Sequence, residues 1–280
     1  MSERPLDTGT DDLLGRIDGH VAVLTFNRPE ARNALSPGVY DGFDRALPVV
    51  AADPEVRVLM ITGAGGAFCA GGDVKGMANR NAAATDGSAP PAPSVEEKVA
   101  DLRRRQRGVS LALHSLPKPV VAALPGAAAG AGMSIAMAAD LRVAAERALI
   151  VTAFTTIGAS GDFGGSWFLT RLLGEAKAKE LYFRSPRLSA SEAQELGLVN
   201  QVFADDDFEA LALGYCHELA ARPPIALRYV KENINRASEV DLATALDAEA
   251  AAMVRTMSTE DHAEAAAAFV AKRSPTFRGH

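Results

Sequence analysis

The sequence predicts an α/β fold in which a core of parallel strands is followed by a helical region. Two early runs, HVAVLTF (20–26) and VRVLMITG (56–63), are rich in β-branched residues and bounded by turn residues, as strands are. Two later runs, PVVAALPG (119–126) and DLRVAAE (140–146), have the same character, with helical patterns between them. Strands that alternate with helices form βαβ units, and such units build parallel sheets.

The helical region begins after Ser189. Residues 189–192 have the Ser-x-x-Glu form of a capping box, and Gly197 is expected to end the helix that they start. Ala-rich amphipathic segments then continue to Phe269. We therefore expect a core over residues 1–205 and a C-terminal helical region over 206–280.

Composition excludes several classes of protein. The chain has 280 residues, of which 48% are hydrophobic and 23% charged, so it can bury a full core. Its formal net charge of −6 argues against nucleic acid or an anionic membrane as a partner. Cys69 and Cys216 are too few for a disulfide framework, and the histidines have no metal-ligand spacing.

The start of the chain is polar and acidic, unlike a secretory signal. No run reaches the roughly 20 apolar residues of a membrane span. We expect a cytoplasmic protein without a bound metal. Residues 78–95 are rich in Ala, Pro, Ser and Gly and lack periodicity, so we interpret them as a surface loop.

Two glycine-rich turns follow predicted strands. The first is GGAFCAGGDVKGM (65–77), and the second is PGAAAGAGMSIAMAAD (125–140), which opens an Ala-rich helix. Small residues at the end of a strand let backbone N–H groups approach a ligand, so the two turns could converge on one oxygen. The alternatives are a plain turn for the first and close helix packing for the second. Neither turn matches a nucleotide-binding fingerprint.

Asp162 is the acidic residue of the run GASGDFGGSW (158–167), where glycines flank it. One interpretation is an N-cap, because Asp accepts hydrogen bonds from the first N–H groups of a helix and an apolar run follows. The other is a carboxylate that transfers a proton. The local sequence leaves both open.

Five segments together resemble the enoyl-CoA hydratase/isomerase, or crotonase, family in order and spacing. They are FNRPEARNALS (26–36), AFCAGGDVKGM (67–77), PGAAAGAGMSIAMAADLRVA (125–144), LSASEAQELGLVNQVF (188–203) and AFVAKRSPTF (268–277). The resemblance covers nearly the whole chain. It implies a crotonase-like spiral of ββα units, a C-terminal helical region that forms a homotrimer or a dimer of trimers, and acyl-CoA thioester substrates. Coenzyme A is then part of the substrate, and no separate cofactor is expected.

The resemblance implies a role for the two glycine-rich turns. Chemistry next to a thioester places negative charge on its carbonyl oxygen, and two fixed N–H donors stabilise that charge. At the matching positions the donors are the backbone N–H groups of Gly72 and Ala131. Ala131 stands where glycine is common in the family, but an alanine has the same backbone N–H donor as a glycine. The helix that starts near Ala131 would add the positive end of its dipole.

The resemblance also implies residues that bind coenzyme A. The segment that starts at Arg28 would border the pantetheine, and the AGGD turn would lie on the adenine side. Phe269 and Lys272 would reach coenzyme A bound in a neighbouring subunit. The alternative interpretation is a helix end at which Phe269 is packed and Lys272 is solvated. The residues that the resemblance implies for coenzyme A are Arg28, Ala70, Gly71, Asp73, Lys75, Phe269 and Lys272.

Departures from the family pattern indicate the reaction. Ser134 and Phe154 stand where a typical hydratase of this family has its two catalytic glutamates. A site without either glutamate is poorly equipped to activate water. Asp162 matches the aspartate of the epoxyphenylacetyl-CoA isomerase branch, whose ending the chain also resembles.

The expected function is therefore the movement of a double bond in an enoyl-CoA, with Asp162 carrying a proton between C2 and C4. One alternative is an enoyl-CoA hydratase with a non-standard acid/base set, and another is a catalytically weak relative that binds acyl-CoA. The 4-chlorobenzoyl-CoA dehalogenase branch pairs its aspartate with a histidine on the preceding helix. This chain has only His114 at the end of that helix, which disfavours that branch.

Overall fold

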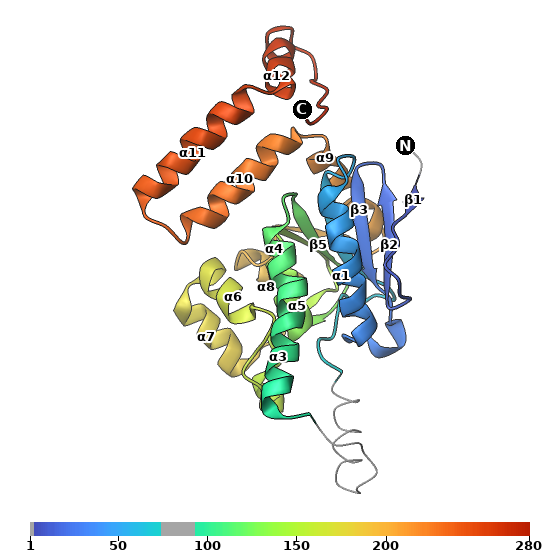
Figure 1. Ribbon diagram of the computed structural model, residues 1–280. Helices are drawn as coiled ribbons and strands as arrows, with labels where there is room; N and C mark the ends of the chain where they lie inside the picture. Colours follow the sequence, from blue (N-terminus) through green and yellow to red (C-terminus); the bar gives the residue numbers. More distant parts are fainter. Residues whose placement is uncertain (1–2, 74–92) are drawn as a thin grey trace, which may run out of the picture.

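The structure is a computed structural model that describes residues 3–73 and 93–280 (Figure 1). Within this part, seven strands form one sheet in the order β1-β2-β3-β4-β5-β7-β10. Their bounds are β1 Arg4–Pro5, β2 Leu13–Asp18, β3 Val21–Phe26, β4 Val58–Gly63, β5 Val120–Leu124, β7 Leu141–Ala145 and β10 Gln201–Phe203. Strands β3, β4, β5, β7 and β10 run parallel, while β1 and β2 form an antiparallel edge. The four predicted strands and their parallel arrangement are confirmed.

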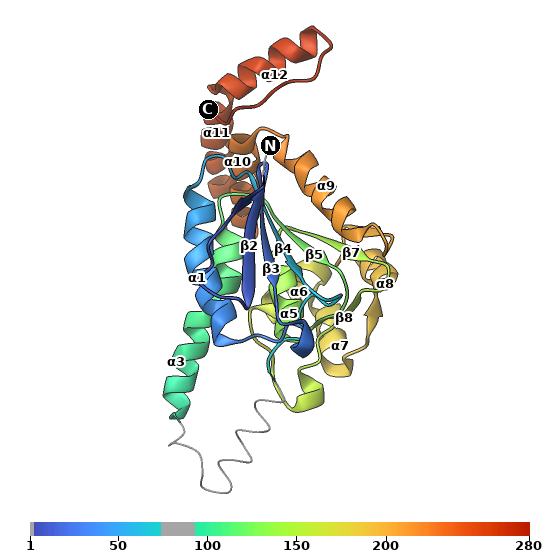
Figure 2. The same cartoon turned by 90° about the vertical axis from the view of Figure 1, so that its right-hand side faces the viewer.

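The sheet is buried on both faces, which is why its strands read as continuous apolar runs. Leu24, Leu59 and Ala122 belong to one apolar cluster together with helix α1 (Pro37–Ala52). Alternate residues of the same strands form a second cluster with helix α9 (Phe208–Ala220). Figure 2 shows α1 and α9 on opposite sides of the sheet.

A second, three-stranded sheet lies beside the first. It contains β6 Ala128–Ala129, β8 Leu149–Val151 and β9 Leu188–Ser189. The helix α5 (Ala131–Ala138) follows β6, and all eight of its residues are buried. Small residues therefore let this helix lie in the centre of the molecule.

Further helices cover the buried centre. They are η1 Pro29–Ala31, α3 Val95–Gln106, the π-helical turn η2 Arg107–Leu111, α4 Ala112–Ser115, η3 Thr155–Ile157, α6 Gly165–Leu173, α7 Glu175–Arg184 and α8 Ala190–Glu195. The predicted capping box is confirmed, because Ser189 and Glu192 satisfy each other's backbone N–H groups at the start of α8. The expectation that the chain is helical from Ser189 onward is wrong at β10, which adds a strand to the edge of the main sheet.

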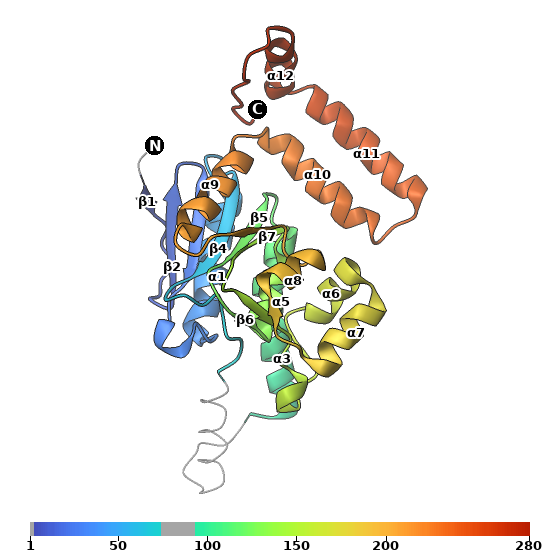
Figure 3. The same cartoon turned by 180° about the vertical axis from the view of Figure 1, so that it is seen from behind.

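The last three helices extend away from the sheets (Figures 1 and 3). They are α10 Pro224–Ala237, α11 Leu242–Met257 and α12 Glu260–Val270. Lys231 ties α10 to the core, because its Nζ lies 2.8 Å from Asp140 Oδ2 and donates to the backbone oxygens of Leu113 and Lys118.

Cys69 and Cys216 are buried free thiols. None of the helices in residues 3–73 and 93–280 is long and apolar enough to cross a membrane. The boundary at residue 205 stays a prediction.

Candidate active site

The two glycine-rich turns meet in the structure. Cys69 in the first turn forms a parallel bridge with Ala128 in the second. A Cβ atom on Gly71 would lie 2.7 Å from the oxygen of Ala129 and 3.0 Å from the nitrogen of Ala131. Only glycine fits there, and its φ of +84° also favours glycine. The two turns therefore lie against each other, and their convergence on one substrate oxygen stays a prediction.

Two N–H groups are left available where the turns meet. Ala131 is the first residue of α5, where backbone N–H groups have no partner within the helix. Its N–H and that of Gly72 donate no hydrogen bond to any residue that the structure describes. Two fixed donors next to a helix N-terminus can stabilise negative charge on one oxygen.

Asn33 holds the segment after Arg28 against the first turn. Its side chain is buried, with Nδ2 donating to the oxygens of Ala64 at 2.9 Å and Ala67 at 2.8 Å. Its Oδ1 accepts from the N–H of Arg28 at 2.9 Å. No local pattern in the sequence predicts the bonds from Asn33 Nδ2, because Ala64 and Ala67 lie more than thirty residues away.

The predicted coenzyme A residues of the first turn lie along this segment. The N–H of Ala70 donates to Arg32 at 3.0 Å, and Gly71 accepts from Leu35 at 2.8 Å. Asp73 is the last residue described before the gap. Lys75 and most of the predicted loop at 78–95 lie outside the described residues.

Asp162 lies in a tight loop before α6. Its neighbours Gly161, Phe163 and Gly164 all have positive φ angles, of +111°, +49° and +79°. The N-cap of α6 is Gly164, which forms no side-chain cap. The interpretation of Asp162 as an N-cap is therefore wrong, because the glycine-rich loop places its carboxylate before the cap position.

The carboxylate of Asp162 is instead directed into a buried environment. Its Oδ1 is inaccessible and has no hydrogen-bond partner among the described residues. Burial raises the pKa of Asp162 to about 6, because the charged form loses hydration. Burial is also the main reason for the raised pKa values of Tyr40, Cys69 and Tyr182, and the charge of Asp162 contributes in each case. The charge of Asp162 therefore acts on residues of α1, of the first glycine-rich turn and of α7.

Aromatic residues form one wall of this environment. Phe163 is buried and stacks on Tyr40, with 6.1 Å between ring centroids. The guanidinium of Arg105 covers the Tyr40 ring, 4.6 Å from its centroid. Sequence patterns gave no signal for Tyr40 or Arg105, because they belong to α1 and α3, far from Asp162 in the chain.

Of the two positions without a glutamate, Ser134 lies in α5 and Phe154 lies close to the start of that helix. Ser134 is buried, and its Oγ donates to the oxygen of Gly130 at 3.3 Å. Phe154 stacks on Tyr182, with 5.9 Å between ring centroids. A Cβ atom on Gly130 would lie 3.8 Å from the Phe154 ring, so this ring packs close to the start of α5. Neither residue supplies an acid or a base.

Three other sequence candidates lie elsewhere. The ring of His114 packs edge-on against Trp167 and Phe168, at a cavity of about 500 Å³ between α6 and α10. Phe269 is 86% exposed, and Lys272 follows it at the exposed end of α12. A single chain does not bring Phe269 or Lys272 to the two turns, so their contact with coenzyme A in a neighbouring subunit stays a prediction.

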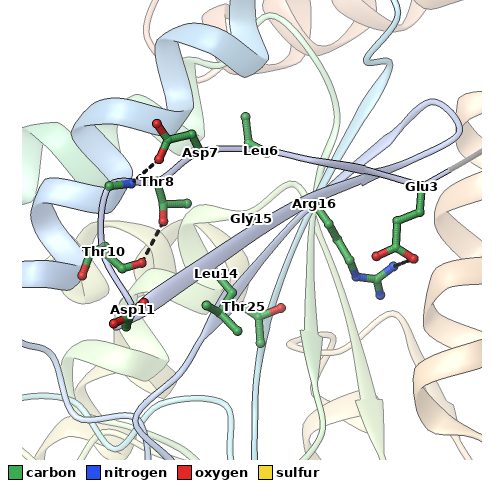
Figure 4. Close-up of a pocket in the computed structure, with 11 residues that line it drawn as sticks. Glu3, Leu6, Asp7, Thr8, Thr10, Asp11, Leu14, Gly15, Arg16 and Thr25 are labelled. Carbon is green, nitrogen blue, oxygen red and sulfur yellow. Dashed lines mark hydrogen bonds and ion pairs between the residues drawn. The ribbon is translucent and has the colours of Figure 1, made fainter.

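A hollow of about 660 Å³ lies over the N-terminal strands. Asp7, Thr8 and Thr10 line it together with Arg16 and Glu3 (Figure 4). None of its lining residues belongs to the predicted site. Across residues 3–73 and 93–280, no group of three or more His, Cys, Asp or Glu side chains is arranged to hold a metal ion.

Comparison with known proteins agrees with this geometry. The sequence profile described as Enoyl-CoA hydratase/isomerase matches residues 16–280. The chain is 37% identical to 1,2-epoxyphenylacetyl-CoA isomerase of Escherichia coli (strain K12), over 95% of this chain and 98% of that protein. It is 34% identical to short-chain-enoyl-CoA hydratase of Clostridium acetobutylicum, over 91% and 93% of the two chains.

A solved structure is similar throughout. The crystal structure of an enoyl-CoA hydratase from Polaromonas sp. JS666 has a TM-score of 0.86 and 37% identity, and the match covers 95% of this chain and 99% of that one. The α/β crotonase fold expected from the sequence is therefore confirmed.

Proposed function

Because the chain belongs to the enoyl-CoA hydratase/isomerase family, we propose that it moves a double bond within an enoyl-CoA by transferring one proton through Asp162. The observation that carries the proposal is the buried carboxylate of Asp162, whose Oδ1 is unpartnered in the described part of the chain. Ser134 and Phe154 occupy the positions where a hydratase of the family would have its glutamates. The site therefore offers one proton carrier and lacks the pair that hydration uses.

The proposed reaction begins at the thioester oxygen. The N–H groups of Gly72 and Ala131 hold this oxygen and stabilise the negative charge that develops on it. Asp162, as the carboxylate, takes a proton from C2 of a 3-enoyl-CoA, or from C4 when the shift starts from a 2-enoyl-CoA. For a 3-enoyl-CoA, the electron pair of the broken C2–H bond forms a C1–C2 double bond, and the carbonyl electrons move onto the thioester oxygen, which gives a dienolate that still has its C3–C4 double bond.

The second step returns the same proton. Asp162 is now a carboxylic acid and donates to the other carbon, while the enolate electrons form the new C–H bond. No water and no oxidant is consumed. A pKa of about 6 suits this role, because the group can both accept and release a proton near neutral pH.

Hydration is the second candidate, favoured by the similarity to a relative named short-chain-enoyl-CoA hydratase. It would need Asp162 to serve both the water and the α-carbon. A relative that binds acyl-CoA and turns none over is the third candidate. We propose that coenzyme A enters as part of the substrate, against Arg28, Ala70, Gly71 and Asp73.

A substrate panel tests these candidates. The protein is incubated with 2-enoyl-CoA, 3-enoyl-CoA and ring-derived acyl-CoA thioesters, and double-bond migration and hydration are followed separately. We expect migration to exceed hydration for any shared acyl chain. Rapid hydration of crotonyl-CoA, at a rate usual for an efficient hydratase, would contradict the proposal. If the protein turned over none of the thioesters in the panel, the third candidate, a relative that only binds acyl-CoA, would be favoured.

A further inference from the structure

Two buried polar atoms, Asp162 Oδ1 and Tyr182 Oη, are complementary in their hydrogen bonding. Neither atom has a hydrogen-bond partner in the part of the chain that the structure describes, and Tyr182 on α7 is only 9% exposed. An ionised carboxylate can only accept hydrogen bonds, whereas a phenol can donate one. A buried polar group that stays unpaired is costly, so each atom lacks what the other offers.

The Tyr182 hydroxyl lies between the glycines on either side of Asp162. The Cβ position of Gly161, the residue before Asp162, is 3.2 Å from Tyr182 Oη, and that of Gly165 is 2.5 Å from it. The N–H of Gly165 donates to the backbone oxygen of Asp162 at 3.2 Å, so both glycines belong to the turn that carries the carboxylate. The Tyr182 ring also stacks on Phe154, with an interplanar angle of 8°. The ring is therefore held in place, while the hydroxyl proton can turn about the C–O bond.

Ser134 Oγ is a second acceptor beside the same hydroxyl. It lies 2.3 Å from the Cβ position of Gly165, which is also the point close to Tyr182 Oη. Ser134 donates its own proton to the backbone oxygen of Gly130 at 3.3 Å, so the lone pairs of its Oγ remain able to accept. The Tyr182 proton thus has one acceptor on α5 and another on the loop before α6.

The pKa of Tyr182 reflects both neighbours. Burial first and the charge of Asp162 second raise this pKa to about 12, while a side-chain hydrogen bond with Ser134 acts in the opposite direction. The geometry between the two hydroxyls nevertheless falls short of a full hydrogen bond, so the Tyr182 proton is not committed to Ser134. The phenol keeps its proton at neutral pH and can serve as a donor.

The other titratable groups around Asp162 are neutral or paired. Burial is the main cause of the raised pKa values of Tyr40 on α1 and Cys69 in the first turn, so both stay protonated. Arg105 of α3 covers the Tyr40 ring, and its guanidinium lies 2.6 Å from the Asp101 carboxylate. Within the described chain, Tyr182 therefore responds to one charge, that of Asp162.

Resting on the function proposed above, we propose that Tyr182 is a positioning residue whose hydroxyl changes its hydrogen-bond acceptor as Asp162 gains and loses the proton. While Asp162 is ionised, a small rotation brings Oδ1 to the Tyr182 hydroxyl, which donates to it and leaves Oδ2 for the substrate carbon. Once Oδ2 has taken the proton, Oδ1 is a neutral carbonyl oxygen and a weaker acceptor. The Tyr182 proton then turns to Ser134 Oγ. The hydroxyl is thus paired in both protonation states of Asp162.

Infrared spectroscopy of the full-length protein measures the protonation of Asp162 without turnover. The C=O band of a protonated carboxylic acid grows as the pH is lowered through the range around pH 6 where Asp162 titrates. The part of the band that Asp162→Asn lacks belongs to Asp162. Its midpoint is measured in the wild type, in Tyr182→Phe, in Ser134→Ala and in the double variant. Tyr215→Phe on α9 is the matched control, because it removes the same hydroxyl on the other face of the sheet.

The two hydroxyls should move the midpoint in opposite directions. Tyr182→Phe should shift it to a pH about 1 higher, because the ionised carboxylate loses a charge-assisted donor. Ser134→Ala should shift it lower by about half as much, because the protonated state loses a weaker bond between neutral groups. Ser134→Ala should have no further effect in the Tyr182→Phe background, since Ser134 acts on Asp162 only through the tyrosine. Tyr215→Phe should leave the midpoint unchanged.

Turnover tests the proposed function separately. The acid limb of the pH profile for double-bond migration should follow the infrared midpoint in each variant. The KM for acyl-CoA should stay the same, because Tyr182 acts on Asp162 and not on the substrate. If the midpoints shift as expected but the profile does not follow them, the exchange of acceptors stands and the proposed role of Asp162 in the reaction fails.

Three results would overturn the proposal. The first is a Tyr182→Phe midpoint equal to or below that of the wild type. The second is a Ser134→Ala midpoint that is not lowered, or that is lowered equally with and without the Tyr182 hydroxyl. The third is a shift in Tyr215→Phe as large as that in Tyr182→Phe.

Discussion

At the scale of single residues, the surroundings of Asp162 explain its proposed chemistry. Three neighbours with positive φ angles form a loop that buries the carboxylate without giving its Oδ1 a partner within the described chain. Burial raises the pKa to about 6 because the ionised form is poorly solvated. This arrangement costs stability, and such costs concentrate at functional sites.

The raised pKa predicts how stability depends on pH. Because the pKa of Asp162 is higher in the folded state than its ordinary value of 3.8, the folded state binds the proton more tightly. The carboxylate therefore destabilises the protein fully above pH 6, and the penalty disappears as the pH falls towards 4. We expect Asp162→Asn to raise the free energy of unfolding by about 2 kcal/mol at pH 8.

Urea unfolding at several pH values measures this effect. The gain from Asp162→Asn should shrink between pH 6 and pH 4. A gain of the same size at pH 8 and pH 4.5, or a loss at pH 8, would show that the carboxylate is not held in a desolvated environment.

The sequence predicted some of these residues and not others. Asp162 stood out because glycines flank it and because it matches an aspartate of the family. Its lack of an N-cap role was not predictable, since Gly164 replaces it as the cap through a left-handed backbone. Tyr40 and Tyr182 reach the site from distant helices, and no local pattern records a tertiary contact.

At the scale of elements, the strands longer than four residues in the parallel sheet were predictable and the short ones were not. The runs that become β3, β4, β5 and β7 are rich in β-branched or small apolar residues. The strands β6, β9 and β10 have two or three residues each, which is too short for any periodicity. The helix α5 was predictable because it follows a glycine-rich turn with an unbroken run of small and apolar residues.

The meeting of the two glycine-rich turns gives a prediction at this scale. Gly71→Ala should destabilise the protein by about 3 kcal/mol or more, because it combines a positive φ with a Cβ 2.7 Å from the oxygen of Ala129. Turnover should fall as well, since the clash displaces the N–H of Ala131. Chemical unfolding and activity measurements check both effects.

Gly66→Ala is the matched control in the same turn. Gly66 has a φ of +78° but nothing within 4 Å of an added Cβ, so only the backbone strain of about 1 to 2 kcal/mol applies. Equal losses for the two variants would mean that the close approach of the turns does not shape the site.

At the scale of the whole molecule, the last three helices expose an unusual amount of apolar surface. The exposed large apolar side chains of α10 to α12 are Val230, Ile234, Leu242, Leu246, Met253, Val254, Met257, Phe269 and Val270. Large apolar side chains that stay exposed in such number are typical of a surface that another protein covers. The Lys231 ion pair holds α10 against the core, so these helices present that surface in a defined direction.

We therefore predict that the protein is a homotrimer or a dimer of trimers in solution. Light scattering at micromolar concentration measures the mass directly. Met253→Glu on α11 should shift the population to smaller species, because it places a charge in the apolar surface. A wild-type monomer would contradict the prediction and would remove the basis for contacts of Phe269 and Lys272 with coenzyme A in a neighbouring subunit.

The central claim is that Asp162 carries the proton, and Asp162→Asn tests it most directly. Asn keeps the size of the side chain and leaves the N–H groups of Gly72 and Ala131 unchanged. Turnover of a 3-enoyl-CoA should fall by about 100- to 10,000-fold, because that is what general acid–base groups contribute. Acyl-CoA binding should persist, and the melting temperature should not fall. An Asn variant that retains most of the isomerase rate would show that Asp162 is not the proton carrier.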